Sequence, residues 1–261
     1  MSTQLPQSSE RLYHDLAYLW PVISPPEEYV PEALQFVDLF RRYVLPPGQR
    51  LDNLAPKNLS LLHLGCGGGH LDLTLKKYFK LLGVDLSPEM LHLARTLNPE
   101  VLYLEGDMRT IRLGERFDAV LIADSIDYML DEADLEAAFL AAWEHLRPGG
   151  VFITYAEETQ EHFENNRTES STHAHGDLEV TLVENLYDPD PADSTYEMTF
   201  LYLIRSAGKL AIEYDRHLAG IFPLATWTRL LEKTGFSIQV LEPEGETMPF
   251  LIARKSLDSG L

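Results

Sequence analysis

The chain of 261 residues contains a single cysteine, Cys66, and few basic residues. One cysteine excludes a disulfide within the chain. No segment has the roughly 18 uncharged apolar residues that a membrane-spanning helix needs. Lys and Arg number 21 against 41 Asp and Glu, which gives a formal charge of −20. Because such an acidic surface repels phosphate groups, we expect neither a nucleic acid nor a membrane as a partner.

Residues 1–10 are polar and lack the apolar stretch that a signal peptide contains. We therefore expect a cytoplasmic protein. The histidines of residues 156–176 stand near Glu158 and Glu161, but their spacing fits no tight pattern of metal ligands. We expect no metal site and interpret this polar segment as a mobile loop.

Segments typical of strands alternate with segments typical of helices along the first half of the chain, which is the pattern of a parallel sheet. Strands are expected at 60–64, 81–85, 101–104, 117–123 and 151–155, with helices at 69–78, 87–97 and 131–146 between them. Two further helices are expected upstream, at 11–20 and 31–45. The segment 48–58 reads as a linker.

The pattern changes after residue 155. Three segments, 178–187, 196–206 and 209–218, alternate apolar and polar residues, and the turn of Ala207 and Gly208 is short enough to require antiparallel strands. A helix at 224–234 and strands at 236–242 and 248–254 follow. The sequence predicts a doubly wound, mostly parallel seven-stranded sheet (a Rossmann-like α/β fold). Its expected parts are an N-terminal helical cap (1–50), a nucleoside-binding domain (51–155 and 221–261) and an inserted antiparallel β module on the substrate side (156–220).

The most informative stretch is LLHLGCGGGH at 61–70, followed by LLGVD at 81–85. An apolar strand runs into a glycine loop, and a second apolar strand ends in an acid. Glycines let the backbone approach a ligand where a Cβ would collide. Asp85 stands where an acid accepts hydrogen bonds from ribose hydroxyls. The arrangement predicts a nucleoside site.

The glycine spacing indicates which nucleoside is bound. In the dinucleotide fingerprint a third glycine stands five residues after the first, and His70 holds that position here. The glycines stand instead at 65, 67 and 69, the spacing of S-adenosylmethionine-dependent methyltransferases. The chain resembles class I of that family in four further motifs, which follow in the family's order: GVDLSPEML at 83–91, Gly106-Asp107-Met108, FDAV at 117–120 and LRPGGV at 146–151.

The resemblance implies S-adenosylmethionine as cofactor, S-adenosylhomocysteine as product, and a set of cofactor residues. These are Tyr13, His63, Gly65, Cys66, Gly67, Gly69, Asp85, Leu86, Met90, Gly106, Asp107, Met108, Ala123, Asp124 and Ser125. In this set Asp85 would hold the ribose, Asp107 would accept from the adenine amine, and Met108 would pack on the ring. His63 departs from the family, which usually has an acid there to place the cofactor's amino group. Either another group compensates or cofactor affinity is reduced.

A narrower resemblance concerns the acceptor side. Tyr13-His14-Asp15-Leu16-Ala17 is similar to the N-terminal segment of small-molecule methyltransferases, and DSIDYM at 124–129 is similar to a loop of amino-sugar N,N-dimethyltransferases. Those enzymes and the glycine N-methyltransferases also carry an antiparallel insertion after the fifth strand. The candidate catalytic residues are Tyr13, Tyr128 and His217. Their alternatives are a packing residue of the cap, a buried aromatic and a histidine satisfied by its neighbours.

We therefore expect methyl transfer from S-adenosylmethionine to a small-molecule acceptor, with an amine as the first choice, by in-line displacement. Three alternatives stay open at this point: an O-methyltransferase of a hydroxyl or carboxyl compound, an NAD-dependent oxidoreductase, and a non-catalytic protein that binds the cofactor. The edge of the inserted sheet could also pair two subunits into a homodimer.

Overall fold

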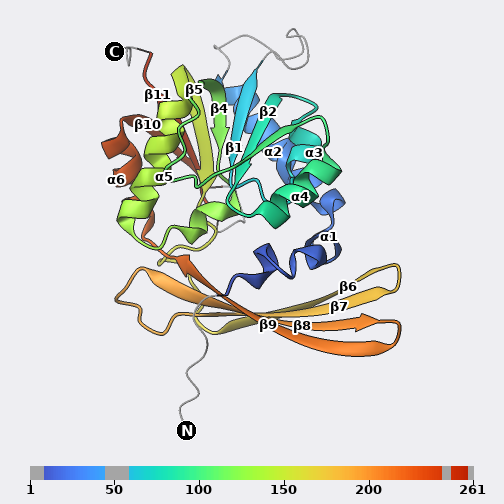
Figure 1. The fold of residues 1–261 in the computed structure, drawn as a ribbon. Helices are drawn as coiled ribbons and strands as arrows, with labels where there is room; N and C mark the ends of the chain where they lie inside the picture. The colour runs from blue at the N-terminus through green and yellow to red at the C-terminus, as the bar shows by residue number, and fades with distance from the viewer. Residues whose placement is uncertain (1–8, 45–58, 243–247, 258–261) are drawn as a thin grey trace.

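The computed structural model describes residues 9–44, 59–242 and 248–257, which form two sheets (Figure 1). The larger sheet has seven strands in the order β10-β11-β5-β4-β1-β2-β3. Its strands are β1 (Ser60–Leu64), β2 (Lys80–Asp85), β3 (Leu102–Glu105), β4 (Phe117–Leu121), β5 (Leu146–Tyr155), β10 (Phe236–Leu241) and β11 (Phe250–Lys255). The two pairings of β11, with β10 and with β5, are antiparallel, and the other four pairings are parallel. The predicted doubly wound, mostly parallel sheet is confirmed.

Helices cover both faces of this sheet and enclose two hydrophobic cores. One face carries α2 (Val30–Val44) and α3 (Asp72–Leu75), whose buried Phe36, Phe40 and Leu75 pack on the sheet. On the other face lie α5 (Glu132–His145) and α6 (Leu224–Thr234), with Phe139 and Trp227 in the core. The helix α4 (Pro88–Leu97) packs against β2 and β3. Burial on both faces explains why the central strands read as nearly continuous apolar runs.

Local signals in the sequence set the ends of the helices. Ser87 caps α4, since its hydroxyl accepts a hydrogen bond from the backbone N–H of Met90 at 3.0 Å, and Pro88 occupies the first helical position. At the end of α6, Gly235 has a φ of +104°, a left-handed conformation that suits glycine. Both boundaries were predicted, and the structure confirms them.

The smaller sheet is antiparallel and has four strands in the order β6-β7-β8-β9. They are β6 (Arg167–His175), β7 (Leu178–Tyr187), β8 (Thr195–Ser206) and β9 (Lys209–Gly220). The interpretation of residues 156–176 as a loop is wrong, because 167–175 pair with β7 along their whole length. Sequence periodicity missed β6 because nearly all of its side chains are exposed, so no apolar face marks it as a strand.

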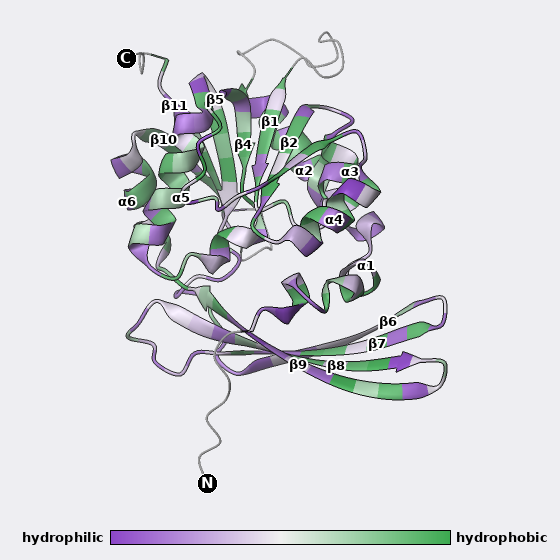
Figure 2. Cartoon of the chain, viewed as in Figure 1, coloured by the Kyte–Doolittle hydropathy of each residue, from purple (hydrophilic) through white to green (hydrophobic). Residues whose placement is uncertain are grey.

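The N-terminal segment lies between the two sheets (Figure 1). It is not the single helix predicted at 11–20. It consists of short turns η1 (Arg11–Tyr13), η2 (Ala17–Leu19) and η3 (Pro26–Tyr29), with a one-turn helix α1 (Trp20–Ile23). A buried cluster joins it to the smaller sheet: Leu12, Leu16, Leu19, Val22 and Ile23 with Val180, Phe200, Tyr202 and Ile204. Figure 2 shows hydrophobic and hydrophilic residues mixed along the strands of that sheet, whose apolar face meets this segment.

Other differences from the predictions are small. The helix α3 covers only 72–75 of the predicted 69–78, and β5 begins at residue 146 instead of 151. The second strand and the helix that follows it lie within one residue of their predicted bounds. The predicted linker at 48–58, the turn at 243–246 and most of the predicted N-terminal tail lie outside the described residues.

Candidate active site

A cavity of about 370 Å³ opens at the carboxyl ends of β1, β2, β3 and β4. Ligands of parallel α/β sheets bind at this edge. The segments that follow these four strands line it, and Tyr13 and Trp20 of the N-terminal segment line it as well. Most of the predicted cofactor residues are in the wall: Tyr13, His63, Gly65, Cys66, Gly67, Asp85, Leu86, Met90, Gly106, Asp107, Met108, Ala123, Asp124 and Ser125.

The glycine loop after β1 forms a backbone cradle at one end of this cavity. The N–H groups of Gly65 and Cys66 both donate to the carbonyl of Val84, at 2.7 and 3.0 Å, which fixes the loop against β2. Gly65 has a φ of +69°, and a Cβ on it would stand 1.9 Å from Ser125 Oγ. No atom lies within 4 Å of the position of a Cβ on Gly67. The loop therefore closely approaches the segment that follows β4 at Gly65 and presents open space at Gly67.

Asp85, at the end of β2, is held by the loop it faces. Its carboxylate accepts hydrogen bonds from the N–H of Gly67 at 2.7 Å and of Ser87 at 2.9 Å. Burial raises the pKa of Asp85 even though these backbone hydrogen bonds oppose the change. Two N–H donors thus orient the carboxylate, and its remaining lone pairs are available to hydroxyl donors in the cavity.

Asp107 follows β3 and forms an ion pair that the sequence did not predict. The Arg109 guanidinium donates to Asp107 Oδ2 at 2.6 Å, and its other Nη reaches Asp134 at 2.7 Å. The hydrogen bonds from Arg109 lower the pKa of Asp107 below its ordinary value. Arg109 and Asp134 also line the cavity. Arg109 directly follows the predicted motif at 106–108 and gave no signal of its own in the sequence.

His63 stands where the related family has an acid, and it is paired with one. Its Nδ1 lies 2.7 Å from Asp72 Oδ1, and the side chains of both residues are buried. Asp72 also accepts from the hydroxyl of Tyr103 at 3.0 Å. Because the carboxylate accepts, Nδ1 carries the proton and Nε2 presents a lone pair. Nε2 is buried with no hydrogen-bond partner within the described residues, and His63 lines the cavity. The cavity thus contains an unused acceptor in the position of the missing acid.

Three carboxyl groups from distant segments share the side of the cavity near His63. Asp124 lines the cavity, and burial together with repulsion from Glu32 raises its pKa to about 7. Burial raises the pKa of Glu32, on α2, to about 7 and that of Glu157, after β5, to about 8. Asp124 lines this cavity, whereas Glu157 lines a second hollow, and both residues are exposed to solvent. The neighbouring Asp127 has a buried carboxylate with no hydrogen-bond partner in the described part of the chain. A cation entering here would meet several carboxyl groups.

Two tyrosines of the cavity wall lie close together at their hydroxyl groups. The hydroxyls of Tyr13 and Tyr128 are 2.8 Å apart, and Tyr128 Oη lies 2.6 Å from His217 Nδ1. His217 itself is fully buried on β9 and does not line the cavity, so the prediction that it acts at the reaction centre needs a route through Tyr128.

The cavity wall differs from the prediction at some positions. Gly69 also lies outside the cavity wall, since a Cβ on it would meet Asn98 and Tyr103. Trp20, Tyr29 and His70 belong to the wall but were not predicted, because no motif distinguishes them from packing aromatics. Within the described residues no group of three or more His, Cys, Asp or Glu side chains could hold a metal ion.

The strand order, the glycine cradle after β1 and the acid at the end of β2 are those of the class I methyltransferase fold. Residues 61–150 match the family model described as methyltransferase domain. This match decides the choice of nucleoside cofactor in favour of S-adenosylmethionine over a dinucleotide. The reading as a methyltransferase is thereby confirmed.

Two curated relatives are amino-sugar enzymes. The chain is 35% identical over 142 residues to dTDP-3-amino-3,4,6-trideoxy-α-D-glucopyranose N,N-dimethyltransferase of Streptomyces venezuelae, an alignment that covers 54% of each chain. It is 28% identical over 217 residues to dTDP-3-amino-3,6-dideoxy-α-D-glucopyranose N,N-dimethyltransferase of Streptomyces fradiae, with 82% of this chain and 80% of that protein covered. The first alignment thus spans about half of that relative's length.

Solved structures extend the likeness to the whole fold. The crystal structure of Streptomyces venezuelae DesVI superposes with a TM-score of 0.78 at 26% identity, covering 96% of this chain and all of that one. The smaller sheet and the N-terminal segment are therefore part of a shared architecture. Among the described residues no helix is long and apolar enough to cross a membrane.

Proposed function

We propose that this protein transfers a methyl group from S-adenosylmethionine to an amine of a small-molecule acceptor. The observation that carries the choice of an amine is the acidic side of the cavity, where Asp124 stands with Glu32 and Glu157 nearby. In their ionised form carboxyl groups attract a cationic amine by charge, whereas they offer a neutral hydroxyl only a hydrogen bond. The two relatives described above are N,N-dimethyltransferases of amino sugars, and this similarity supports the same choice.

The residues of the cavity fit the cofactor. The open space at Gly67 and the oriented carboxylate of Asp85 suit a ribose beside the glycine loop, with Asp107 and Met108 on the adenine side. The unused lone pair of His63 Nε2 suits the cofactor's amino group. When bound, S-adenosylmethionine supplies a methyl group that is attached to a positively charged sulfur. The sulfur is the leaving group and keeps the electron pair of the broken carbon–sulfur bond. The protein's own contribution is to position the acceptor in line and to exclude water.

Tyr13 and Tyr128 are proposed to enclose the place of transfer. Tyr13 comes from the N-terminal segment, and its backbone carbonyl accepts a hydrogen bond from Ser87, which holds that segment over the cofactor side. Tyr128 follows β4 and faces the same space. The acceptor is proposed to enter between these tyrosines and the carboxyl groups, so that its nitrogen reaches the methyl group with little freedom to rotate.

The test is a methyl-transfer assay with paired acceptors. Amino sugars, free and linked to a nucleoside diphosphate, are incubated with the protein and S-adenosylmethionine beside their hydroxyl counterparts, and mass spectrometry counts the methyl groups gained. We expect one or two methyl groups on nitrogen and none on the hydroxyl analogues. Transfer to the hydroxyl or carboxyl compounds at equal or higher rates would overturn the choice of an amine and favour an O-methyltransferase.

Three further predictions belong with this proposal. A cytoplasmic location is proposed, and the acidic composition supports a small-molecule partner in place of a nucleic acid. A homodimer through the edge of the smaller sheet is measured by light scattering after gel filtration. The division into cap (1–50), cofactor domain (51–155 and 221–261) and inserted module (156–220) is proposed as the functional organisation, with the inserted module facing the acceptor.

A further inference from the structure

A continuous line of hydrogen bonds runs from the cavity into the smaller sheet. It joins the hydroxyls of Tyr13 and Tyr128 at 2.8 Å, Tyr128 Oη to His217 Nδ1 at 2.6 Å, and His217 Nε2 to Asp215 Oδ2 at 2.8 Å. The tyrosines line the cavity, whereas the side chains of His217 and Asp215 are fully buried on β9. A buried pair of ionisable groups therefore communicates with the cavity only through two phenols.

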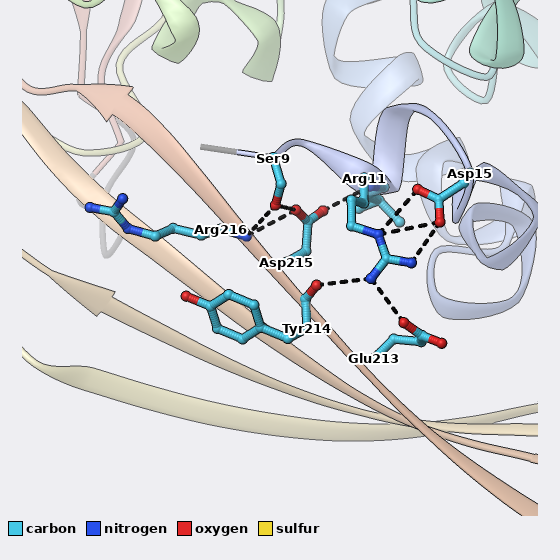
Figure 3. A network of polar contacts seen from close by, with 8 residues as sticks. Ser9, Arg11, Asp15, Glu213, Tyr214, Asp215 and Arg216 are labelled. Carbon is cyan, nitrogen blue, oxygen red and sulfur yellow. Dashed lines mark hydrogen bonds and ion pairs between the residues drawn. The ribbon is translucent and has the colours of Figure 1, made fainter. Parts of the chain in front are cut away.

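The Asp215 carboxylate, at the buried end of this line, determines which group donates and which accepts in each hydrogen bond. The Asp215 carboxylate accepts from Ser9 Oγ at 2.7 Å (Figure 3). It also accepts from the N–H of Leu12 at 2.8 Å and from His217. Because the carboxylate accepts, His217 carries its proton on Nε2, and its Nδ1 is a lone pair. Tyr128 must then donate to Nδ1, and Tyr13 must donate to Tyr128. The lone pairs of the Tyr13 oxygen are left for a donor in the cavity.

The groups around this line determine where a proton can rest. Burial raises the pKa of both Tyr13 and Tyr128 above the ordinary value for tyrosine, so neither serves as a base. For Asp215 burial also acts to raise the pKa, but hydrogen bonds from His217 and Ser9 outweigh it and keep the carboxyl ionised. Besides these three groups, Glu184 of β7 interacts electrostatically with His217, and the ring of Phe200 of β8 packs against it. His217 is thus the member that can accept a proton beside a fixed negative charge.

We propose that the His217–Asp215 pair receives the proton that the acceptor amine must lose, with Tyr128 and Tyr13 as the relay. This rests on the proposed function, since an alkylammonium ion has no lone pair and cannot attack a methyl group. The ammonium N–H gives its proton to the Tyr13 oxygen as the Tyr13 proton passes to Tyr128 and the Tyr128 proton to His217 Nδ1. The freed nitrogen pair forms the new N–C bond, and the carbon–sulfur pair stays on sulfur. His217 becomes an imidazolium next to Asp215, and charge is conserved.

Asp215 has a second part in this arrangement. The hydrogen bonds that it accepts from Ser9 and Leu12 tie down the segment that carries Tyr13, and Arg11 of the same segment reaches Glu213 of β9 at 2.8 Å (Figure 3). Tyr13 therefore meets Tyr128 only when the N-terminal segment lies on β9. His217 and Asp215 are positioning residues that act through the tyrosines, and they touch neither substrate nor cofactor.

The decisive variant is His217→Gln, because an amide accepts from Tyr128 and donates to Asp215 but takes up no proton. Alkyl amines have pKa values of about 8 to 10, so few molecules are neutral near pH 7. We expect turnover of the variant to fall roughly a hundredfold near pH 7 and to recover toward the wild-type rate by about pH 10, where the amine is already neutral. The affinity for S-adenosylmethionine should stay unchanged. His175→Gln, at an exposed position on β6, is the matched control and should behave as wild type.

Tyr128→Phe interrupts the relay one step earlier and should give the same pH-dependent defect. A loss of rate that is equal at all pH values, or no loss, would overturn the relay while leaving amine methylation intact. Absence of any amine methylation by the wild-type protein would instead refute the proposed function. A readout without turnover covers that case: in protein labelled with ¹⁵N-histidine, the His217 signal, assigned by its loss in His217→Gln, should show a proton on Nε2 only. A proton on Nδ1 would overturn the relay directly.

Discussion

His63 donates a hydrogen bond through Nδ1 to Asp72, at 2.7 Å, while its Nε2 is buried with no hydrogen-bond partner within the described residues. His63 belongs to the cavity wall, and the carboxylate of Asp72 lies behind its imidazole ring. A carboxylate that polarises an imidazole makes its far nitrogen a stronger acceptor. We propose that this pair compensates for the family's acid, with Asp72 supplied from α3, nine positions later in the chain.

Replacing His63 should weaken the cofactor's amino-acid end selectively. In His63→Leu the acceptor is lost, and we expect S-adenosylmethionine to bind roughly 5- to 150-fold more weakly, the equivalent of about 1 to 3 kcal/mol for a hydrogen bond to a charged group. Binding of 5′-methylthioadenosine, which lacks the amino-acid part, should not change. Isothermal titration with both ligands measures the difference, and His63→Gln, which keeps an acceptor, is the control. An equal loss for both ligands would contradict the role.

The glycine cradle should tolerate a methyl group at one position and not at the other. Both Gly65 and Gly67 have positive φ, so alanine costs about 1 kcal/mol of backbone strain at each. Only at Gly65 does the new Cβ collide, with Ser125 Oγ at 1.9 Å. We expect Gly65→Ala to lower the melting temperature and abolish cofactor binding, and Gly67→Ala to keep the fold. Similar melting temperatures for the two variants would show that β4 can move away.

Asp85 is expected to serve the ribose and the loop at once. In Asp85→Ala the N–H groups of Gly67 and Ser87 lose their acceptor, so the loop loosens as the ribose contact disappears. Affinity for S-adenosylmethionine should fall by about 1 to 3 kcal/mol. Adenine alone, which carries no ribose, serves as the comparison ligand in the same titration. Unchanged affinity for the full cofactor would place the ribose elsewhere.

Stability should fall as the pH rises through neutrality. The carboxyls of Glu32, Asp124 and Glu157 hold their protons up to pH 7 or 8 in the folded state, because burial raises their pKa values to about 7, 7 and 8. In the unfolded chain they release them near pH 4. Between these limits the folded state binds more protons, so the free energy of unfolding decreases as the pH increases.

Urea unfolding at about pH 5.5 and about pH 8 measures this slope. Asp124→Asn should flatten it by removing one such group. Asp177→Asn removes the same formal charge at an exposed turn and should leave the slope as it is. A wild-type stability that rises over this interval would contradict the buried protonated state of these carboxyls.

Removing residues 160–220 tests the proposed division of the chain. The deletion takes away Val180, Phe200 and Tyr202, against which Leu12 and Leu19 pack. We expect the seven-stranded sheet to fold and still bind adenosine, while hydrogen exchange over residues 9–23 becomes fast. Loss of all folded signal would instead make the smaller sheet part of the central core.

Much of the fold was predictable because each signal was local. The glycine loop, the acid at the end of β2 and the Ser87 cap depend on neighbours within a few positions, and the structure places all three as predicted. The exposed strand β6 could not be found in that way, since it is defined by pairing with β7 and has no buried face.

The polar architecture of the site was predictable only in part. Position 63 was recognised as a departure, but its partner Asp72 was not, because the contact depends on how α3 packs on β1. Tyr128 and His217 were both candidates, yet their hydrogen bond joins residues 89 positions apart. The acidic side combines Glu32, Asp124 and Glu157 from three separate segments, and only the completed fold brings them together.

The placement of β11 between β5 and β10 imposes an order of assembly. The strand β10 precedes β11 in the chain but hydrogen-bonds to the sheet only through it. During synthesis, residues 236–241 therefore have no partner until residues 250–255 have emerged, and the edge of β5 stays open for the same time. The border of the sheet farthest from β3 is therefore completed only after β11 has been synthesised, although β10 is made before it.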